Sequence, residues 1–205
     1  MRGEASSPCK KKAARAGAIT LGCGRSPALS RRFDRTPTGG RLHFASALTL
    51  LERQDGDDAT AGASYLELVE LLAQRGAQTG RDLEQLWRRI AFFVCVSNTD
   101  DHLRNHGFML EADGWALAPA YDMNPDPNGQ GLRLNISETD NAQDLGLLLE
   151  VAPWFRVERR QAAAILDQVV AAVRGWRAAA QARGIPRSEQ DRMARAFRVA
   201  EGWAR

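Results

Sequence analysis

The sequence predicts a mainly helical domain that carries one small β-hairpin. Three observations support this fold class. Apolar residues recur at helical spacing over most of residues 64–202. The pair Asp113–Gly114 separates two short apolar segments, which is typical of a hairpin turn. The chain has 205 residues, of which 44% are hydrophobic and 26% charged, and this composition is typical of one globular domain.

The N-terminal residues 1–31 are expected to form a disordered basic leader, because they lack sustained periodicity and are rich in Gly, Ala and Ser. Residues 1–35 carry nine basic and two acidic side chains, whereas residues 36–205 carry 19 and 23. All three lysines lie in the run Lys10–Lys12. A signal peptide or a nucleic-acid-binding tail are the alternatives, but the apolar part of the leader is short and interrupted. We therefore expect no direct binding of nucleic acid.

The cysteines and the hydropathy indicate a cytoplasmic protein. Cys9, Cys23 and Cys95 are odd in number and widely spaced, which suits neither a disulfide framework nor a zinc site. Cys95 lies in the apolar run Ala91–Val96 and is expected to be buried. No stretch approaches the ~20 apolar residues that a bilayer-spanning helix needs, so no membrane partner is expected.

The first regular elements follow the leader. The segment Arg41–Leu51 suits a short strand or turn that leads into a helix. A helix over about 65–75 should begin after Ser64 as N-cap, with Glu67 completing a capping box, and should end at Gly76.

A second helix is predicted over 81–96, and its last turns are apolar on all sides, so this end should lie in the core. A polar cluster, Ser97–His106, follows at once. The hairpin then pairs Gly107–Leu110 with Trp115–Ala118. A loop rich in Pro and Gly covers Asp122–Gly131, and three more helices are expected near 141–151, 157–183 and 188–202.

Three oxygen-bearing side chains in and after the polar cluster have informative spacing. Asp100 lies five residues before Asn105, and Asp122 follows the hairpin. The catalytic loop of protein kinases places its Asp five residues before its Asn, and a later Asp binds the metal. Mg²⁺ is bound by one or two carboxylates together with phosphate oxygens and water. A network of Asx turns capping the preceding helix would give the same spacing.

The two histidines of the cluster allow a different hypothesis. His102 and His106 are four residues apart, so on a helix they would share one face. With Asp100 or Asp122 as a third ligand they could hold a transition metal in a hydrolase. No H-E-x-x-H motif supports this, and a hydrogen-bonded structural histidine is the commoner reading of either residue.

The cluster and the residues after the hairpin together resemble the C-terminal region of the HipA-like serine/threonine kinases, the toxins of bacterial toxin–antitoxin modules. The resemblance extends over Arg32–Phe197 and implies a domain over residues 32–205. It implies a helical, kinase-like C-terminal lobe with a small hairpin next to the catalytic loop. Its most specific segments are Ser97–Asn105 and Leu117–Asp122, and Arg32–Arg35 with Gly40–Phe44 resembles the junction of the two kinase lobes.

The resemblance also implies roles for single residues. Asp100 would be the catalytic base, Asn105 and Asp122 the Mg²⁺ ligands, and His102 would lie against the phosphates of ATP. The cofactors implied are therefore ATP and Mg²⁺, with cofactor contacts from His102, Asn105 and Asp122. The implied partners are a protein substrate and a DNA-binding antitoxin. Arg104 and Tyr121 would support the site.

The sequence departs from the family at its N-terminal side. HipA-like kinases carry an N-terminal lobe with a phosphate-binding loop and an ATP-contacting Lys before the segment that corresponds to Arg32–Arg35. Only 31 residues precede Arg32 here, and no Lys follows Lys12. We therefore expect the N-terminal lobe to be absent and the kinase to be inactive without a separate N-lobe chain. The alternative is a non-catalytic module that binds an antitoxin or a kinase partner.

Overall fold

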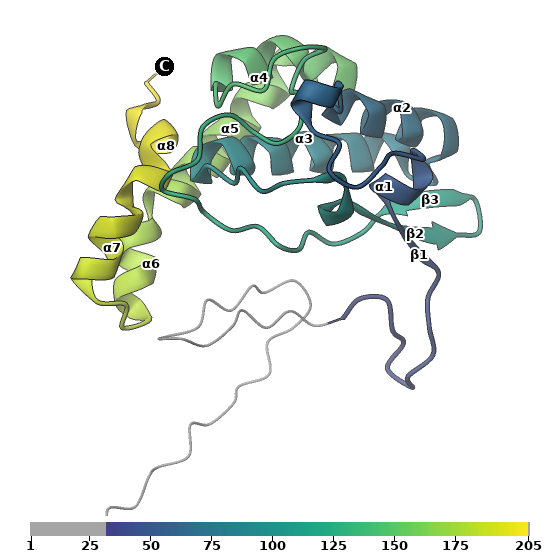
Figure 1. Cartoon of the computed structure of the whole chain (residues 1–205), viewed down its shortest axis with the longest axis horizontal. Helices are drawn as coiled ribbons and strands as arrows, with labels where there is room; N and C mark the ends of the chain where they lie inside the picture. The colour runs from purple at the N-terminus through teal and green to yellow at the C-terminus, as the bar shows by residue number, and fades with distance from the viewer. Residues whose placement is uncertain (1–31, 205) are drawn as a thin grey trace, which may run out of the picture.

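The buried helix α3 (Thr79–Val96) is the axis around which the other elements pack (Figure 1). The structure is a computed structural model, and it describes residues 32–204. Leu83 and Ile90 of α3 have no exposed surface, as their helical spacing predicts. The last turns of the helix are buried on nearly every side, which confirms that this end lies in the core. The expected leader, residues 1–31, lies outside the described residues.

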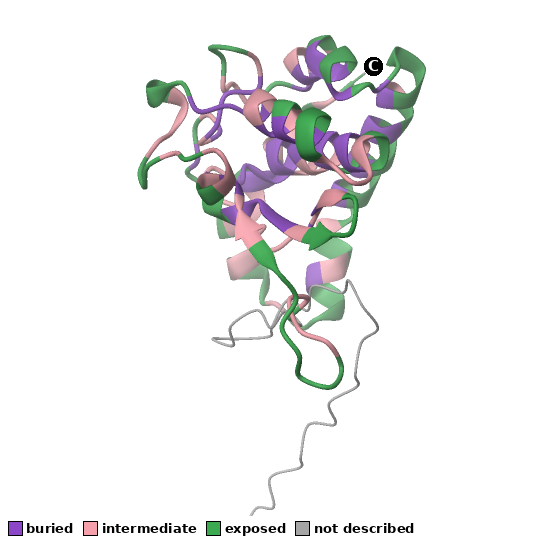
Figure 2. Ribbon diagram, turned by 90° about the vertical axis from the view of Figure 1, so that its right-hand side faces the viewer, coloured by how far each residue is buried: buried purple, intermediate pink, exposed green. Residues whose placement is uncertain are grey.

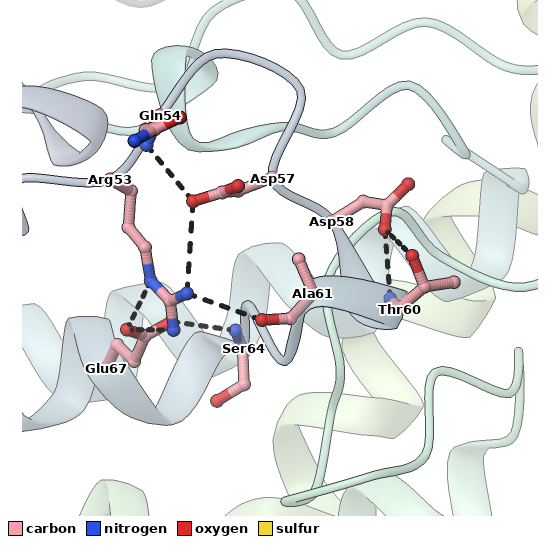
Figure 3. Close-up of polar contacts among 8 residues, drawn as sticks. All are labelled: Arg53, Gln54, Asp57, Asp58, Thr60, Ala61, Ser64 and Glu67. Atoms are coloured by element: carbon pink, nitrogen blue, oxygen red, sulfur yellow. Dashed lines mark hydrogen bonds and ion pairs between the residues drawn. The ribbon is translucent and has the colours of Figure 1, made fainter.

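Helix α2 (Tyr65–Arg75) begins and ends where the sequence predicts. The Ser64 hydroxyl accepts a hydrogen bond from the Leu66 N–H (3.0 Å), and the Glu67 carboxylate accepts one from the Ser64 N–H (3.1 Å). This confirms the capping box. Glu67 also pairs with Arg53 at 2.8 Å, so the start of the helix is tied to the loop before it (Figure 3).

The small sheet contains three antiparallel strands, β1 (Phe44–Ser46), β2 (Gly107–Glu111) and β3 (Gly114–Leu117), in that order. The predicted hairpin is confirmed as β2 and β3. Strand β1 joins it from the other side, with Phe44 opposite Met109. The sequence predicts a strand or turn at this point but no pairing partner, because the two strands are some sixty residues apart in the chain.

The C-terminal helices are shorter than expected. The stretch 157–183 divides at Gly175, a residue that weakens helices, and the stretch 188–202 is interrupted by a 3-10 turn. The remaining elements are α1 (Ala47–Leu50), α4 (Leu145–Val151), α5 (Arg159–Arg174), α6 (Trp176–Ala182), α7 (Arg187–Met193) and α8 (Arg198–Gly202), and the 3-10 turns η1 (Ala59–Ala61), η2 (Leu103–Asn105), η3 (Ala152–Phe155) and η4 (Ala194–Phe197).

The buried residues gather where α3 meets the helices around it, and the exposed ones lie on the outer turns (Figure 2). Trp87 of α3 has no exposed surface, and its indole N–H donates to the carbonyl of Leu148 in α4 (3.1 Å). Cys95 is buried, as predicted. Among the described helices, none combines the length and the apolar character that crossing a bilayer requires. The architecture is thus the predicted one, mainly helical with a small sheet.

Candidate active site

The polar cluster begins where α3 ends, at Ser97. Ser97 adopts a left-handed conformation (φ 52°) that stops the helix and turns the chain back. Its buried hydroxyl donates to the carbonyl of Ala196 (2.9 Å). Two residues later the Thr99 hydroxyl donates to the carboxylate of Asp126 (2.9 Å). The entrance of the loop is therefore held both by the C-terminal helices and by the long loop that follows the hairpin.

The loop brings Asp100 and Asn105 together. The carbonyl of Asp100 accepts hydrogen bonds from the His102 N–H (3.1 Å) and from the side-chain amide of Asn105 (3.1 Å). The Asp100 side chain itself is exposed, whereas Asn105 is largely buried. Because the amide nitrogen of Asn105 is engaged with the backbone, its oxygen is the atom left to act as a ligand.

The segment that carries Asp122 is bonded to the loop through the residue before it. The Tyr121 hydroxyl donates to the carbonyl of Arg104 (2.6 Å). Burial raises the pKa of Tyr121 to about 12, so the phenol keeps the proton that this bond needs. Asp122 is exposed in a left-handed conformation (φ 53°), and its carboxylate accepts a bond from Asn124 (2.7 Å).

His102 is the residue before the 3-10 turn η2 and lies between Asp100 and Asn105 in the sequence. Its side chain is half-buried and lines a small cavity of about 30 Å³ together with Asp55, Arg104 and Arg133. Arg104 is ion-paired with Asp55 across this cavity. The Nδ1 atom of His102 is buried and has no hydrogen-bond partner among residues 32–204. The cavity has room for about one water molecule.

His106 has a different environment from the one that the metallohydrolase hypothesis requires. Residues 102–106 do not form an α-helix, and the fully buried His106 directs Nε2 to Asp101 (2.8 Å) instead of towards His102. Within the described part of the chain, no group of three His, Cys, Asp or Glu side chains is placed to hold a metal ion. His106 is thus a hydrogen-bonded structural histidine, one of the two alternatives that the sequence allows.

Asp101 is the site residue that sequence reasoning missed. It is fully buried, and its Oδ2 accepts a hydrogen bond from the Tyr65 hydroxyl (2.8 Å) as well as contacting His106. Burial lowers the pKa of the nearby Arg89 to about 10, and attraction to Asp101 opposes that shift. Nothing in the pair Asp100–Asp101 reveals which carboxylate faces solvent, because both partners of the buried one lie elsewhere in the sequence.

The donor set suits a magnesium ion bound jointly with a nucleotide. The loop offers the amide oxygen of Asn105, and Asp122 and Asp100 add exposed carboxylates. Mg²⁺ favours such sparse oxygen sites, in which phosphate oxygens and water complete the coordination. Oxygen donors of these types can hold a phosphate-bound cation, and an exposed carboxylate can accept a proton.

Comparisons with known proteins identify a family and a similar fold. A family model described as HipA-like C-terminal domain matches residues 7–176. A solved structure of HipA from Shewanella oneidensis MR-1, described as a toxin–antitoxin complex with HipB and operator DNA, has a similar fold with a TM-score of 0.63. Its sequence identity is 18%, and the match covers 84% of this chain and 47% of that HipA. The chain thus spans about half the length of that relative. No curated protein matches it.

Proposed function

The chain belongs to the HipA-like C-terminal domain family, and from this membership we propose that it is the catalytic-loop half of a serine/threonine protein kinase. The reaction is transfer of the γ-phosphate of ATP to a protein hydroxyl. One observation carries the proposal. The Asn105 side chain donates to the carbonyl of Asp100 and the Tyr121 hydroxyl donates to that of Arg104, which ties the loop of Asp100 and Asn105 to the segment that carries Asp122 and supports the proposal.

Asp100 is the catalytic base of this proposal. Phosphoryl transfer requires little covalent chemistry from the protein, but the attacking hydroxyl must lose its proton. The Asp100 carboxylate is exposed, so a substrate hydroxyl can reach it. The backbone carbonyl of Asp100 accepts two hydrogen bonds, which restricts the range of positions that its carboxylate can occupy. Such general-base assistance contributes on the order of 100-fold or more to the rate.

Asn105 and Asp122 are the proposed Mg²⁺ ligands. When bound, Mg²⁺ would neutralise charge on the phosphates of ATP. The Asn105 amide is held by its bond to the Asp100 carbonyl, and one oxygen of the Asp122 carboxylate accepts the bond from Asn124, so both side chains are partly oriented in advance. His102 lies between Asp100 and Asn105 in the loop, and we assign it to the phosphates of the nucleotide.

The nucleotide also requires contacts that these residues do not supply. Kinases position the phosphates with a glycine-rich loop and a Lys on a strand of the N-terminal lobe. No Lys follows Lys12 in this sequence. Because positioning provides much of the rate enhancement in this reaction, the 205 residues alone should transfer phosphate slowly or not at all. We therefore propose that the kinase is active only together with an N-lobe that supplies these contacts.

A DNA-binding antitoxin is the second partner that we propose. The similar HipA structure is described as a complex with HipB and operator DNA, and the fold of the present chain matches part of that HipA. Co-purification with the product of the neighbouring gene tests this partner. A complex that survives gel filtration is the expected result, and separate elution of the two proteins would contradict it.

A phosphotransfer assay tests the kinase proposal. Transfer of labelled γ-phosphate from Mg-ATP to protein is measured for the chain alone and for the chain with an N-lobe polypeptide, with wild type, Asp100→Asn and Asp113→Asn compared. Asp113 is an exposed aspartate at the hairpin turn and serves as the matched control. We expect activity only in the complemented wild type and Asp113→Asn samples, and on the order of 100-fold less with Asp100→Asn.

Two results would overturn parts of the proposal. Complemented activity that is indifferent to Asp100→Asn would remove the catalytic base. Robust, Asp100-dependent transfer by the 205 residues alone would show that no N-lobe is needed.

A further inference from the structure

We propose that the buried hydrogen bond between Asp101 and His106 is a clamp that positions Asp100 and Asn105 for their roles in phosphoryl transfer. The proposal rests on the kinase function proposed above, and it names two positioning residues that make no contact with the substrate. Asp101 and His106 are joined through Oδ2 and Nε2 at 2.8 Å, and neither has exposed surface.

The spacing of the clamp matches the spacing of the site. Asp101 and His106 are five residues apart, as are Asp100 and Asn105, and each clamp residue directly follows a functional one. The side-chain bond therefore fixes the two ends of the loop one position beyond the groups that act. Between these ends the turn η2 (Leu103–Asn105) closes with a bond from the Asn105 N–H to the carbonyl of His102 (2.8 Å).

The clamp is anchored in the core on two sides. The Tyr65 hydroxyl donates to the same Oδ2 of Asp101 (2.8 Å), and burial raises the pKa of Tyr65 well above its usual range, so the donor proton stays in place. The rings of Tyr65 and Phe93 both stand edge-on to His106, with centroids 5.7 and 6.1 Å away. The carbonyl of His106 accepts the N–H of Ala47 (2.7 Å).

The position of Tyr65 follows from the capping box. Tyr65 is the first residue of α2, and the mutual hydrogen bonds of Ser64 and Glu67 fix where that helix begins. The backbone N–H of Tyr65 also donates to the carbonyl of Asn135 (3.0 Å). The capping box near residue 64 thereby helps to place the Tyr65 phenol beside Asp101.

Stability alone does not explain a buried ionisable pair. Well-packed apolar residues of similar volume are often as stabilising as such a pair, because burial costs each polar group its hydration. Two atoms of the pair, Asp101 Oδ1 and His106 Nδ1, are buried without a hydrogen-bond partner in the described part of the chain. A hydrogen bond fixes the orientation of the two residues that it joins, whereas apolar packing does not. A loop that carries a proposed base and a proposed metal ligand requires such a fixed orientation.

Hydrogen exchange of the loop amides, measured by NMR, tests the clamp on the whole chain. His106→Leu removes the bond, His106→Gln can restore a donor to Asp101, and Tyr65→Phe removes only the other bond to Asp101. We expect the Asn105 amide to exchange about tenfold faster in His106→Leu, relative to the Ile90 amide of α3, which corresponds to about 1.4 kcal/mol. His106→Gln should recover most of this loss, and Tyr65→Phe should show little of it.

Mn²⁺ broadening of the same spectra supplies a readout that general destabilisation would not change. The apparent Mn²⁺ affinity at Asn105 and Asp122 should fall in folded His106→Leu and stay near wild type in Tyr65→Phe. If His106→Leu does not fold, Asp101→Asn is used, because it keeps the shape and removes the carboxylate charge. It should raise the relative Asn105 exchange rate and lower the Mn²⁺ affinity.

The outcomes separate the two proposals. Loop exchange that rises only in step with the Ile90 amide, or equally in Tyr65→Phe and His106→Leu, would overturn the clamp. The same holds for Asp101→Asn if it leaves the relative exchange unchanged. A wild type in which Mn²⁺ broadens neither Asn105 nor Asp122 would count against the proposed function, while the exchange pattern still decides the clamp.

Discussion

Gly107 lets the aromatic rings of Phe44 and Tyr121 pack closely against the start of β2. It directly follows His106, and a Cβ atom at this position would lie 2.2 Å from the ring of Phe44 and 3.3 Å from that of Tyr121. The ring of Phe33 completes the aromatic group, with its centroid 5.9 Å from Phe44 and 5.7 Å from Tyr121. Because Gly107 has no side chain, the rings of Phe44 and Tyr121 can lie close to its backbone. This close approach affects the position of Tyr121 and of the adjacent Asp122.

Gly107→Ala should destabilise the fold and disturb the metal ligands. The new methyl group must displace a ring in a packed site, which costs about 1–3 kcal/mol. Urea unfolding of the variant measures this cost. Gly80→Ala is the matched control, because a Cβ there meets nothing within 4 Å and the residue lies in the first turn of α3. Its helix propensity should make it neutral or stabilising. Wild-type stability of Gly107→Ala would contradict the close approach.

Cys95 should be chemically inert in the folded protein. Burial raises the pKa of its thiol to about 12, so the thiolate fraction at pH 8 is on the order of 10⁻⁴. Alkylation by iodoacetamide, followed by mass spectrometry of the Cys95 peptide, should be about a thousandfold slower than in urea-denatured chain. Modification of the native protein at a rate close to the denatured one would show that the end of α3 opens readily.

At the scale of residues, the sequence indicates the proposed site residues better than the residues that hold them in place. The Asp100 and Asn105 positions follow from one spacing within one loop. The buried role of Asp101 depends on Tyr65, which is 36 residues away, and no local pattern encodes that meeting. For the same reason His106 could be read from the sequence either as a metal ligand or as a core residue.

At the scale of elements, predictions succeed where the signal is local. The capping box fixes the start of α2, and the Asp113–Gly114 pair fixes the hairpin, because each depends on residues a few positions apart. The pairing of β1 with β2 and the break at Gly175 were not predicted. The first depends on contacts distant in sequence. The second depends on one glycine within a long periodic stretch, where periodicity alone favours a continuous helix.

Ser64→Ala should lower the stability of the protein by about 1 kcal/mol, the usual cost of losing an N-cap. The hydroxyl accepts the Leu66 N–H, and without it that donor is left at the helix start. Chemical denaturation measures the loss. Ser188→Ala, at an exposed position in α7, is the control and should change stability by less than about 0.5 kcal/mol. Equal stability of the two variants would contradict the importance of the cap.

At the scale of the whole molecule, the C-terminal helices support a loop that lies about a hundred residues earlier in the chain. Figure 1 shows α8 beside the end of α3, and Arg198, the first residue of α8, donates to the Ser97 hydroxyl (3.0 Å) and to the carbonyl of Gly129 (3.2 Å). It also bonds to Gln143. One guanidinium thus joins the exit of α3, the loop after the hairpin and the segment before α4.

The hydrogen bonds of Arg198 to these three segments could not be predicted from the sequence, although the fold class could. The apolar periodicity that identifies the helices says nothing about which arginine among many is used in the interior. The family resemblance indicates which lobe the chain forms, and the matched fold supports it. The supports of the loop, in contrast, are particular to the packing of this chain and appear only when distant segments are brought together.

Arg198→Ala should therefore act on the molecule as a whole. It removes hydrogen bonds to three segments at once and leaves the buried Ser97 hydroxyl and the Gly129 carbonyl with fewer partners, so we expect a loss of about 2 kcal/mol. Urea unfolding measures it. Arg187→Ala is the matched control, because that side chain is 89% exposed and contacts only Asp191, at 3.9 Å, among the ion pairs of the described residues.

Arg187→Ala should change stability by less than about 0.5 kcal/mol, since exposed ion pairs contribute little. The Arg198 variant should also speed amide exchange at Thr99 and Asn105 relative to Ile90, because the entrance of the loop depends on Ser97 and the C-terminal helices. If Arg198→Ala unfolds at the same urea concentration as Arg187→Ala, or if its exchange rises only at the C-terminus, then α8 does not support the catalytic loop.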